Sequence, residues 1–388
     1  MSNYISSNAN RFYVAVEASY GLAVPVNAAN RFPAVRLQAQ QILQQPKSLN
    51  KTGSRTYLGA SKDGLRQSAF AARTYLTSWN GSGQPAYGPL FQAALGGTPV
   101  LSSGLTVAGV QNGTQISTTA AHGLSIGSAV AVSNEIRFVT SVIDSVTINV
   151  NAPFSSSPAA NAQLAPSASY PLGTALPSLT LYDYWDPVTT VSRIVPGAAV
   201  DLFQISVNGD YHEFAFSGPA ADLLDSLNFV SGSAGLAGFP AEPALASFDY
   251  SIVPGHLGEV WLGGSDQFFT LTSATIAVKN NLDTRNREYG SSNPRGVAPG
   301  PRQVASQITL FAQDDAQTNA LYTAAKQRNP VPAMLQLGQQ HGQLLGIYLP
   351  AVQPEIPDLD DSETRLQWQF KNNLAQGVLN DEMYVAFA

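Results

Sequence analysis

The sequence predicts a mainly β fold: two tandem β-sandwich domains, each with a flanking α-helix, and a small all-β module inserted into the first domain. Three observations lead to this prediction. One order of elements occurs twice along the chain, apolar residues alternate with period two in both copies, and the composition changes between residues 101 and 165. Alternation with period two is the pattern of a half-buried strand. Identity between the copies is low, so two unrelated β domains stay an alternative.

The repeated order is strand, long loop, strand, helix. In the first copy we expect these elements at residues 35–43, 46–64, 65–77 and 87–95, and in the second at 274–280, 284–303, 304–311 and 314–326. The loops read "NKTGSRTYLGASKDGLRQ" and "NREYGSSNPRGVAPGPRQ", which is too long and too rich in Gly and basic residues for a simple hairpin turn. Long loops are normally functional or disordered. Because this one occurs twice in the same structural place, we expect it to reach a neighbouring subunit.

Each copy continues with a pair of strands. In the first copy, strands at 200–207 and 211–217 flank an Asn-Gly pair at 208–209, which favours a tight hairpin turn. In the second copy, strands at 345–352 and 364–370 flank an acidic turn around residues 358–361. One face of each second strand is expected to be buried, and its residues are His212, Phe214 and Phe216 in the first copy and Leu366, Trp368 and Phe370 in the second.

These patterns divide the chain. We expect residues 1–10 to form a flexible N-terminal arm, residues 11–100 and 166–245 to form the first domain, and residues 246–388 to form the second, after a Gly- and Ala-rich break at 231–241. Residues 101–165 are rich in Ser, Thr, Ala and Val and predict four or five short strands. Insertions are tolerated at exposed loop tips, so we expect this module on the outer surface.

Two local helix features are also predicted. The segment 220–225 is expected to form a short helix, and Asp314 is expected to cap the N-terminus of the second long helix, with Asp315 in its first turn.

Composition narrows the function. The chain has 388 residues, which favours two or three domains, and only 12% of them are charged, about half the usual share. Low surface charge is typical of a chain that hides much of its surface in an assembly. The net charge of −6 argues against electrostatic binding of nucleic acid, and the chain has no cysteine. The first residues lack the regions of a signal peptide, so we expect cytoplasmic synthesis and no membrane insertion.

The residue patterns of enzymes and cofactor sites are absent from the sequence. Four histidines (His122, His212, His256 and His341) lie in different segments, and no serine sits in a nucleophile elbow. The stretch "PDLDDSETR" lacks the frame of a calcium-binding loop, so a solvated hairpin tip is the favoured interpretation. We therefore expect no enzymatic activity, no cofactor and no metal.

Several phrases suggest a family. The segments "NRFYVAVEASYG", "KTGSRTYLG", "YGPLFQAALGG" and "QITLFAQDDAQTNALYTAAKQR…LQW", in this order of elements, resemble the tail tube (major tail) proteins of tailed bacteriophages. The resemblance covers most of the chain outside 101–165. It implies tail-tube-like β-sandwich domains in a virion structural protein, which assembles in the host cytoplasm into rings that stack into a hollow tail tube. Viral DNA passes through the lumen without sequence-specific binding.

The resemblance also implies partners and contact residues. The partners are further copies of the chain, the tape measure protein, and the tail terminator and distal tail proteins. Residues 47–64 and 285–302 match the extended loop that contacts neighbouring subunits in this family. The candidate contact residues are Lys47, Lys51, Arg55, Tyr57, Lys62, Arg66, Arg285, Arg287, Arg295 and Arg302. Two copies of the domain in one chain would let three chains form a pseudo-hexameric ring.

Two other interpretations stay open. A trimeric distal-tail or baseplate hub protein would use the same duplicated domains but would cap a tube instead of polymerising. A carbohydrate-binding or adhesin module, suggested by the inserted β module and the four tryptophans, would bind glycan as a monomer.

Overall fold

The computed structural model describes residues 4–44, 51–56, 64–207, 209–245, 251–263 and 267–388. Strands dominate this part of the chain, and it contains two α-helices, α1 (Gly88–Leu95) and α2 (Ala316–Gln327). The prediction of a mainly β fold is confirmed. Two short 3₁₀ turns, η1 (Ala28–Asn30) and η2 (Ser233–Gly235), complete the helical elements of these residues.

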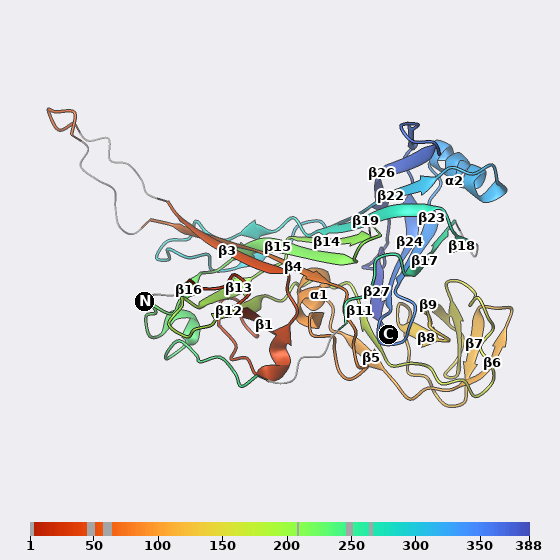
Figure 1. Ribbon diagram of the computed structural model, residues 1–388, viewed down its shortest axis with the longest axis horizontal. Coiled ribbons are helices and arrows are strands. Elements are labelled where there is room, and N and C mark those ends of the chain that lie inside the picture. The colour runs from red at the N-terminus through yellow and green to blue at the C-terminus, as the bar shows by residue number, and fades with distance from the viewer. Residues whose placement is uncertain (1–3, 45–50, 57–63, 208, 246–250, 264–266) are drawn as a thin grey trace.

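One long antiparallel series of strands runs through the molecule (Figure 1). We call this series the long sheet. In spatial order its strands are β3 (Arg36–Leu43), β4 (Arg66–Tyr75), β15 (Glu213–Ala220), β14 (Leu202–Val207), β19 (Leu271–Lys279), β22 (Gln303–Phe311), β26 (Gln367–Ala375) and β25 (Asp358–Asp360).

The long sheet consists of two quartets with the same internal pairing. In the first quartet, β3 pairs with β4, β4 with β15, and β15 with β14. In the second, β19 pairs with β22, β22 with β26, and β26 with β25. In both, the first two strands are joined by a long loop and followed by a helix. The quartets meet where β14 pairs with β19, and this joint makes the sheet continuous within one chain.

A second layer of strands faces the long sheet. In the first half it is a sheet of β16 (Leu224–Asp225), β13 (Arg193–Ala198), β12 (Leu179–Trp185), β1 (Asn10–Val16) and β2 (Arg31–Phe32). In the second half it contains β18 (Gln267–Phe268), β17 (Gly258–Leu262), β23 (Val331–Leu337), β24 (Leu345–Gln353), β27 (Tyr384–Phe387), β11 (Ser167–Tyr170) and β5 (Val100–Ser102).

The two helices pack differently. Helix α1 is apolar except for Gln92 and lies inside the first half, where the ring of Phe91 contacts those of Phe203, Phe214 and Phe387. A helix that is apolar all round is buried, so α1 is a core element instead of the expected flanking helix. It ends at Gly96, whose φ of 91° favours glycine, and where a Cβ would lie 2.7 Å from the Ala175 carbonyl oxygen.

Helix α2 covers the second half with a narrow stripe of buried residues that includes Leu321 and Ala325. Its N-cap is Asp315, whose carboxylate accepts a hydrogen bond from the Thr318 backbone N–H at 2.7 Å. The prediction that Asp314 caps the helix is therefore wrong by one residue. Asp315 adopts the extended backbone that an N-cap requires.

The inserted module is a five-stranded sheet with its own core. Its strand order is β6 (Val107–Gln111), β7 (Gln115–Thr118), β10 (Thr147–Val150), β9 (Glu135–Val142) and β8 (Ala129–Val132), which agrees with the four or five strands predicted. The module begins later than the predicted residue 101, because residues 100–102 form β5, which pairs with β11 of the body. The module packs against the body of the molecule, because Ile136 and Phe138 share a hydrophobic cluster with Met334 and Ala386 of the second half.

A buried arginine adds to this junction. The guanidinium of Arg137 lies 4.1 Å from the centre of the Trp261 ring and forms an ion pair with Glu135. The module therefore sits beside the second half of the body, at lower right in Figure 1.

Two further local predictions are wrong. Residues 220–225 form the end of β15 and the strand β16 instead of a helix, because Ile194 and Leu224 pair across β13 and β16. The acidic residues 358–360 form β25 instead of a turn. The Gly- and Ala-rich segment 231–241 packs on the first half, where Leu236 and Phe239 join a tyrosine cluster. Of the Asn208-Gly209 turn, position 208 lies outside the described residues.

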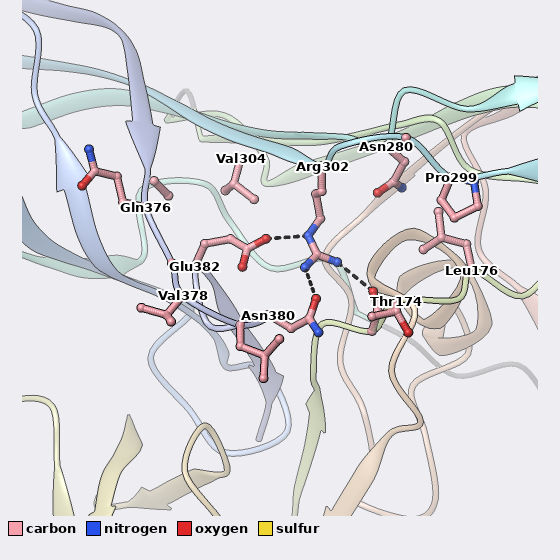
Figure 2. Close-up of a pocket in the computed structure, with 15 residues that line it drawn as sticks. Thr174, Leu176, Asn280, Pro299, Arg302, Val304, Gln376, Val378, Asn380 and Glu382 are labelled. Carbon is pink, nitrogen blue, oxygen red and sulfur yellow. Dashed lines mark hydrogen bonds and ion pairs between the residues drawn. The ribbon is translucent and has the colours of Figure 1, made fainter.

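Figure 2 shows the Arg302 cleft, lined by residues 173–176, 299–304 and 375–382. Its volume is about 780 Å³, and it lies at the end of the second quartet where the loop between β19 and β22 begins.

Candidate assembly surface

The two faces of the long sheet differ sharply in chemistry. The inner face is apolar: Phe203, Phe214, Phe216 and Ile276 are all buried, together with His212 as predicted. The outer face carries short or uncharged polar side chains, because residues opposite one another in the register share a face. Those on the outer face include Gln38, Gln40, Ala69, Ala71, Gln204, Ser206, Ala215, Ser217, Thr275, Ala277, Ala305, Gln307 and Gln369.

The charges on the outer face are few and largely paired. Arg73 lies 3.5 Å from Glu213, and Lys371 lies 2.9 Å from Asp358. Arg36 and Lys279 are exposed on the same face. The result is a mainly polar surface of nearly balanced charge, which also carries the exposed side chains of Ile42, Leu202 and Leu374.

The long sheet has an open edge at β3 and another at β25, while the C-terminal end of β26 pairs with β24 of the second layer. Among the residues that the structure describes, β3 pairs only with β4, and β25 pairs only with β26. Hydrogen bonds alternate in direction along an antiparallel pair. The Gln44 N–H donates to the Leu65 carbonyl at 2.8 Å, which places the N–H groups of Ala39 and Gln41 on the open side of β3. Such an edge is a template for pairing with another strand.

The first loop, between β3 and β4, is described at residues 51–56. Lys47, Tyr57 and Lys62 lie outside the described residues. Lys51 and Arg55 are exposed at the tip, which Figure 1 shows at upper left, away from the body of the molecule. The tip is organised by its own polar side chains, since the Thr52 hydroxyl donates to the Ser54 carbonyl at 3.0 Å.

The second loop, between β19 and β22, contains the short pair β20 (Asp283–Thr284) and β21 (Val297–Ala298). Arg285 forms an ion pair with Glu288, which Arg295 also approaches at 4.0 Å, and Arg287 is exposed. These three predicted contact residues lie on the same loop. Two of them interact with a carboxylate of that loop in this chain.

The second loop reaches the first quartet of its own chain. The Arg66 backbone N–H donates to the Ser292 carbonyl at 2.8 Å, and the Asn293 amide donates to Asp222 at 2.7 Å. Asp222 also accepts a hydrogen bond from Gln41 at 2.7 Å. The loop therefore spans the joint between β14 and β19 and holds the ends of β3, β4 and β15.

Arg302 differs from the other predicted contact residues that form ion pairs in this chain because its ion pair is largely buried. Its Nε lies 2.6 Å from a Glu382 oxygen, Nη1 donates to the Gly173 carbonyl at 2.9 Å, and Nη2 donates to Asn380 at 2.7 Å (Figure 2). The side chains of Arg302 and Glu382 are only 12% and 14% exposed. Arg302 therefore joins three segments of this chain, and its contact with another subunit stays a prediction.

Sequence reasoning missed Asp222, Asn293 and Glu382. Asp222 and Asn293 are 71 residues apart, and Arg302 and Glu382 are 80 apart. No local pattern in the sequence marks either pair. The repeat gave one signal for these residues. The Asp222–Asn293 pair and the Arg302–Glu382 pair both lie where a quartet meets a long loop.

The His, Asp and Glu side chains of the described residues do not gather into a metal site. No group of three or more His, Asp or Glu residues lies close enough in them to hold a metal ion. His212 is buried, its Nε2 lies 3.0 Å from the Leu257 carbonyl oxygen, and burial lowers its pKa. Of the helices described, none has the length and apolar character needed to cross a membrane.

Comparison with known proteins adds no relative. No protein-family model matches the chain, and no curated protein matches it significantly in sequence.

Proposed function

We propose that this chain is a structural subunit of a phage tail tube, in which three copies close into a pseudo-hexameric ring and rings stack into a hollow conduit for DNA. The proposal covers a virion protein whose main partner is itself, and no enzymatic role. It starts from the resemblance of the sequence to tail tube proteins, and the surface of the long sheet supports it independently.

The observation that carries the proposal is the joint between the quartets. Within one chain, β14, the last strand of the first quartet, pairs with β19, the first strand of the second. The same kind of joint between chains would pair β25 with β3 of the next copy. Both strands have an open edge in the described structure. Repeating that joint around a ring would satisfy the unpaired backbone groups of both edges.

The charges at the two edges are complementary. The segment around β25 carries Asp358, Asp360, Asp361 and Glu363. The β3 side carries Arg36 and, on the first loop, Lys51 and Arg55. Arg66 lies on the same side, 4.0 Å from the Asp222 carboxylate. Opposite charge steers association and suppresses pairing between like edges. This favours the pairing of β25 with β3 over the pairing of two β3 edges.

The outer face of the long sheet suits the wall of a conduit. In a closed ring, the outer faces of the three sheets would together form the wall of the conduit. Their Gln, Ser, Thr and Ala side chains are hydrated but carry no positive charge. Binding to DNA phosphates depends on positive charge. A hydrophilic wall with balanced charge would let DNA slide. Stacking of the rings is head to tail, a contact that does not close and therefore grows a fibre.

The hub interpretation uses the same ring geometry and differs only in that the rings do not stack.

The glycan-binding interpretation has less support from the surface. Trp261 is buried beneath Arg137, and Trp368 packs against Tyr322 and Phe370 of the second half. The tryptophans therefore do not gather into one exposed platform.

The test is electron microscopy of the purified full chain, with sedimentation velocity on the same sample. The proposal predicts hollow filaments of stacked rings with three chains in each. Discrete trimeric rings that never stack would favour the hub. A protein that stays monomeric at high concentration would contradict both.

A further inference from the structure

We infer that the Arg302 cleft is the docking site for the first loop of a second copy of this chain. The inference rests on the proposed function, because it requires β3 of one copy to lie beside β25 of another. It assigns a site and an occupant that the ring geometry alone does not specify.

The first step is the intramolecular contact that already exists. The second loop leaves the second quartet, crosses the joint between β14 and β19, and settles on the end of the first quartet through Ser292 and Asn293. Between this loop and the strands lies a cavity of about 480 Å³, lined on the loop side by Thr284, Asn286 and Pro294. One long loop of this chain is thus seen docked on the neighbouring quartet.

The second step is the equivalence of the two places. In the first quartet, Ser68 pairs with Ala220, so that Arg66 and Asp222 lie just beyond, at the loop end of β4 and β15. In the second quartet, Ala305 pairs with Leu374, so that Val304 and Ala375 lie just beyond, at the loop end of β22 and β26. Val304 and Ala375 both line the Arg302 cleft. The cleft therefore occupies the position where the second loop docks on the first quartet.

The third step is that the cleft has a surface to be covered. Its rim carries Val378 and Leu379, whose side chains are 95% and 79% exposed, and Leu374 beside them is 52% exposed. Backbone N–H groups of Val378 and Leu379 donate to Asp381, which fixes this exposed turn. A clustered apolar rim of this kind is typical of an interaction site. Arg302 and Glu382 form its floor and hold it in shape (Figure 2).

The fourth step identifies the occupant. In a ring, the quartet next to the second quartet across the β25 edge is the first quartet of another copy. The loop that this quartet carries is the first loop, whose described tip at 51–56 is fully exposed. Lys51 and Arg55 bring positive charge toward the Asp381 carboxylate beside the rim. The match of loop position and charge points to the first loop of a second copy.

The test is a photo-crosslink from the tip of the first loop in the full chain. Ser54 is replaced by benzoylphenylalanine, and the variant is prepared once with natural nitrogen and once with heavy nitrogen. The two preparations are mixed, assembled together and irradiated. We expect crosslinks between chains of different isotope that map to residues 299–304 or 374–382. The matched control carries the same group in place of Val188, which is 89% exposed, and should not give these crosslinks.

The outcomes separate the two proposals. Rings with crosslinks elsewhere, or with none, would overturn the docking site and leave the proposed ring standing. A chain that forms no ring at any concentration would overturn both. As a second variant, replacing Val378 and Leu379 together by Asp should raise the concentration needed for ring formation by at least about tenfold, the size of a hot-spot loss. Unchanged ring formation in that variant would contradict the site.

Discussion

Leu202 lies directly opposite Lys279, and this pair begins the antiparallel register in which β14 joins β19. Five positions later along the chain, Val207 lies opposite Ala274, so the joint uses the full length of β14. A joint between two repeated quartets inside one chain gives a direct template for a joint between chains. The following predictions test that template and the residues around it.

The open edge of β3 is tested by Ala39→Pro. The Ala39 N–H points away from β4, so proline removes a donor that pairs with no strand in the described part of the chain. Proline is tolerated at edge positions of this kind. We expect the free energy of unfolding of the monomer to change by less than about 1 kcal/mol, while ring formation is lost in sedimentation velocity.

Two controls accompany this variant. Ala39→Val keeps the N–H and should still form rings. Gln40→Pro removes a donor directed at β4 and should destabilise the monomer in urea unfolding. Rings formed by the Ala39→Pro protein would show that β3 is not an inter-chain edge.

Deletion of Lys51–Ala60 tests the first loop. Shortening a surface loop changes the entropy of loop closure by a few tenths of a kcal/mol, so the domain should unfold at nearly the same temperature in calorimetry. Assembly observed by electron microscopy should be abolished, because the loop is proposed to hold the neighbouring chain. A deletion variant that assembles as well as the parent would remove the loop from the account.

Arg302→Ala tests the cluster at the floor of the cleft. Removing the guanidinium leaves the Glu382 carboxylate largely buried without its cation, a change that costs about 3 kcal/mol in comparable pairs. Urea unfolding should show this loss, and Arg302→Lys should restore little of it, because an ammonium cannot replace the planar fork of three donors. The control Arg287→Ala, at an exposed position, should stay within about 0.5 kcal/mol of the parent. Equal stability of the two alanine variants would contradict the role given to Arg302.

The burial of His212 leads us to predict that the free energy of unfolding depends on pH. Burial lowers the pKa of His212 in the folded state below the ordinary value of 6.5. Below pH 6.5 the unfolded chain therefore binds the proton more readily than the folded chain, and the free energy of unfolding falls as the pH is lowered from 6.5 toward the folded pKa. His212→Gln should remove this contribution, so that the difference in stability between parent and variant shrinks from pH 7 to pH 5 in urea titrations. The same exchange at the exposed His256 serves as the control. A constant difference across this range would show that the His212 pKa is not lowered.

The parts of the fold that follow a local period could be predicted from the sequence. The alternation of His212, Phe214 and Phe216 placed them on one buried face, and the strands on either side of both long loops were found close to their observed bounds. The five strands of the inserted module followed from short apolar runs between Gly and polar breaks. In each case neighbours in the sequence decide the structure.

The parts that depend on distant partners could not be predicted in this way. The apolar run of α1 gives no sign of whether it covers the sandwich or fills it, and only the surrounding Phe203, Phe214 and Phe387 settle that it fills it. The acidic residues of β25 were predicted to form a turn, because a strand of three residues is too short to show alternation of apolar and polar side chains. Arg302 looked like a free basic side chain, since its partners lie 80 and 78 residues later and 129 residues earlier.

The central claim is that β25 of one chain pairs with β3 of the next and closes a ring of three chains. Cryo-electron microscopy of the assembled protein, at a resolution that traces strands, measures this directly. The account predicts three chains in each ring and an uninterrupted sheet in which β25 and β3 of adjacent copies are antiparallel neighbours, as β14 and β19 are within the chain. Rings in which these edges stay apart, or rings of six complete chains, would contradict it.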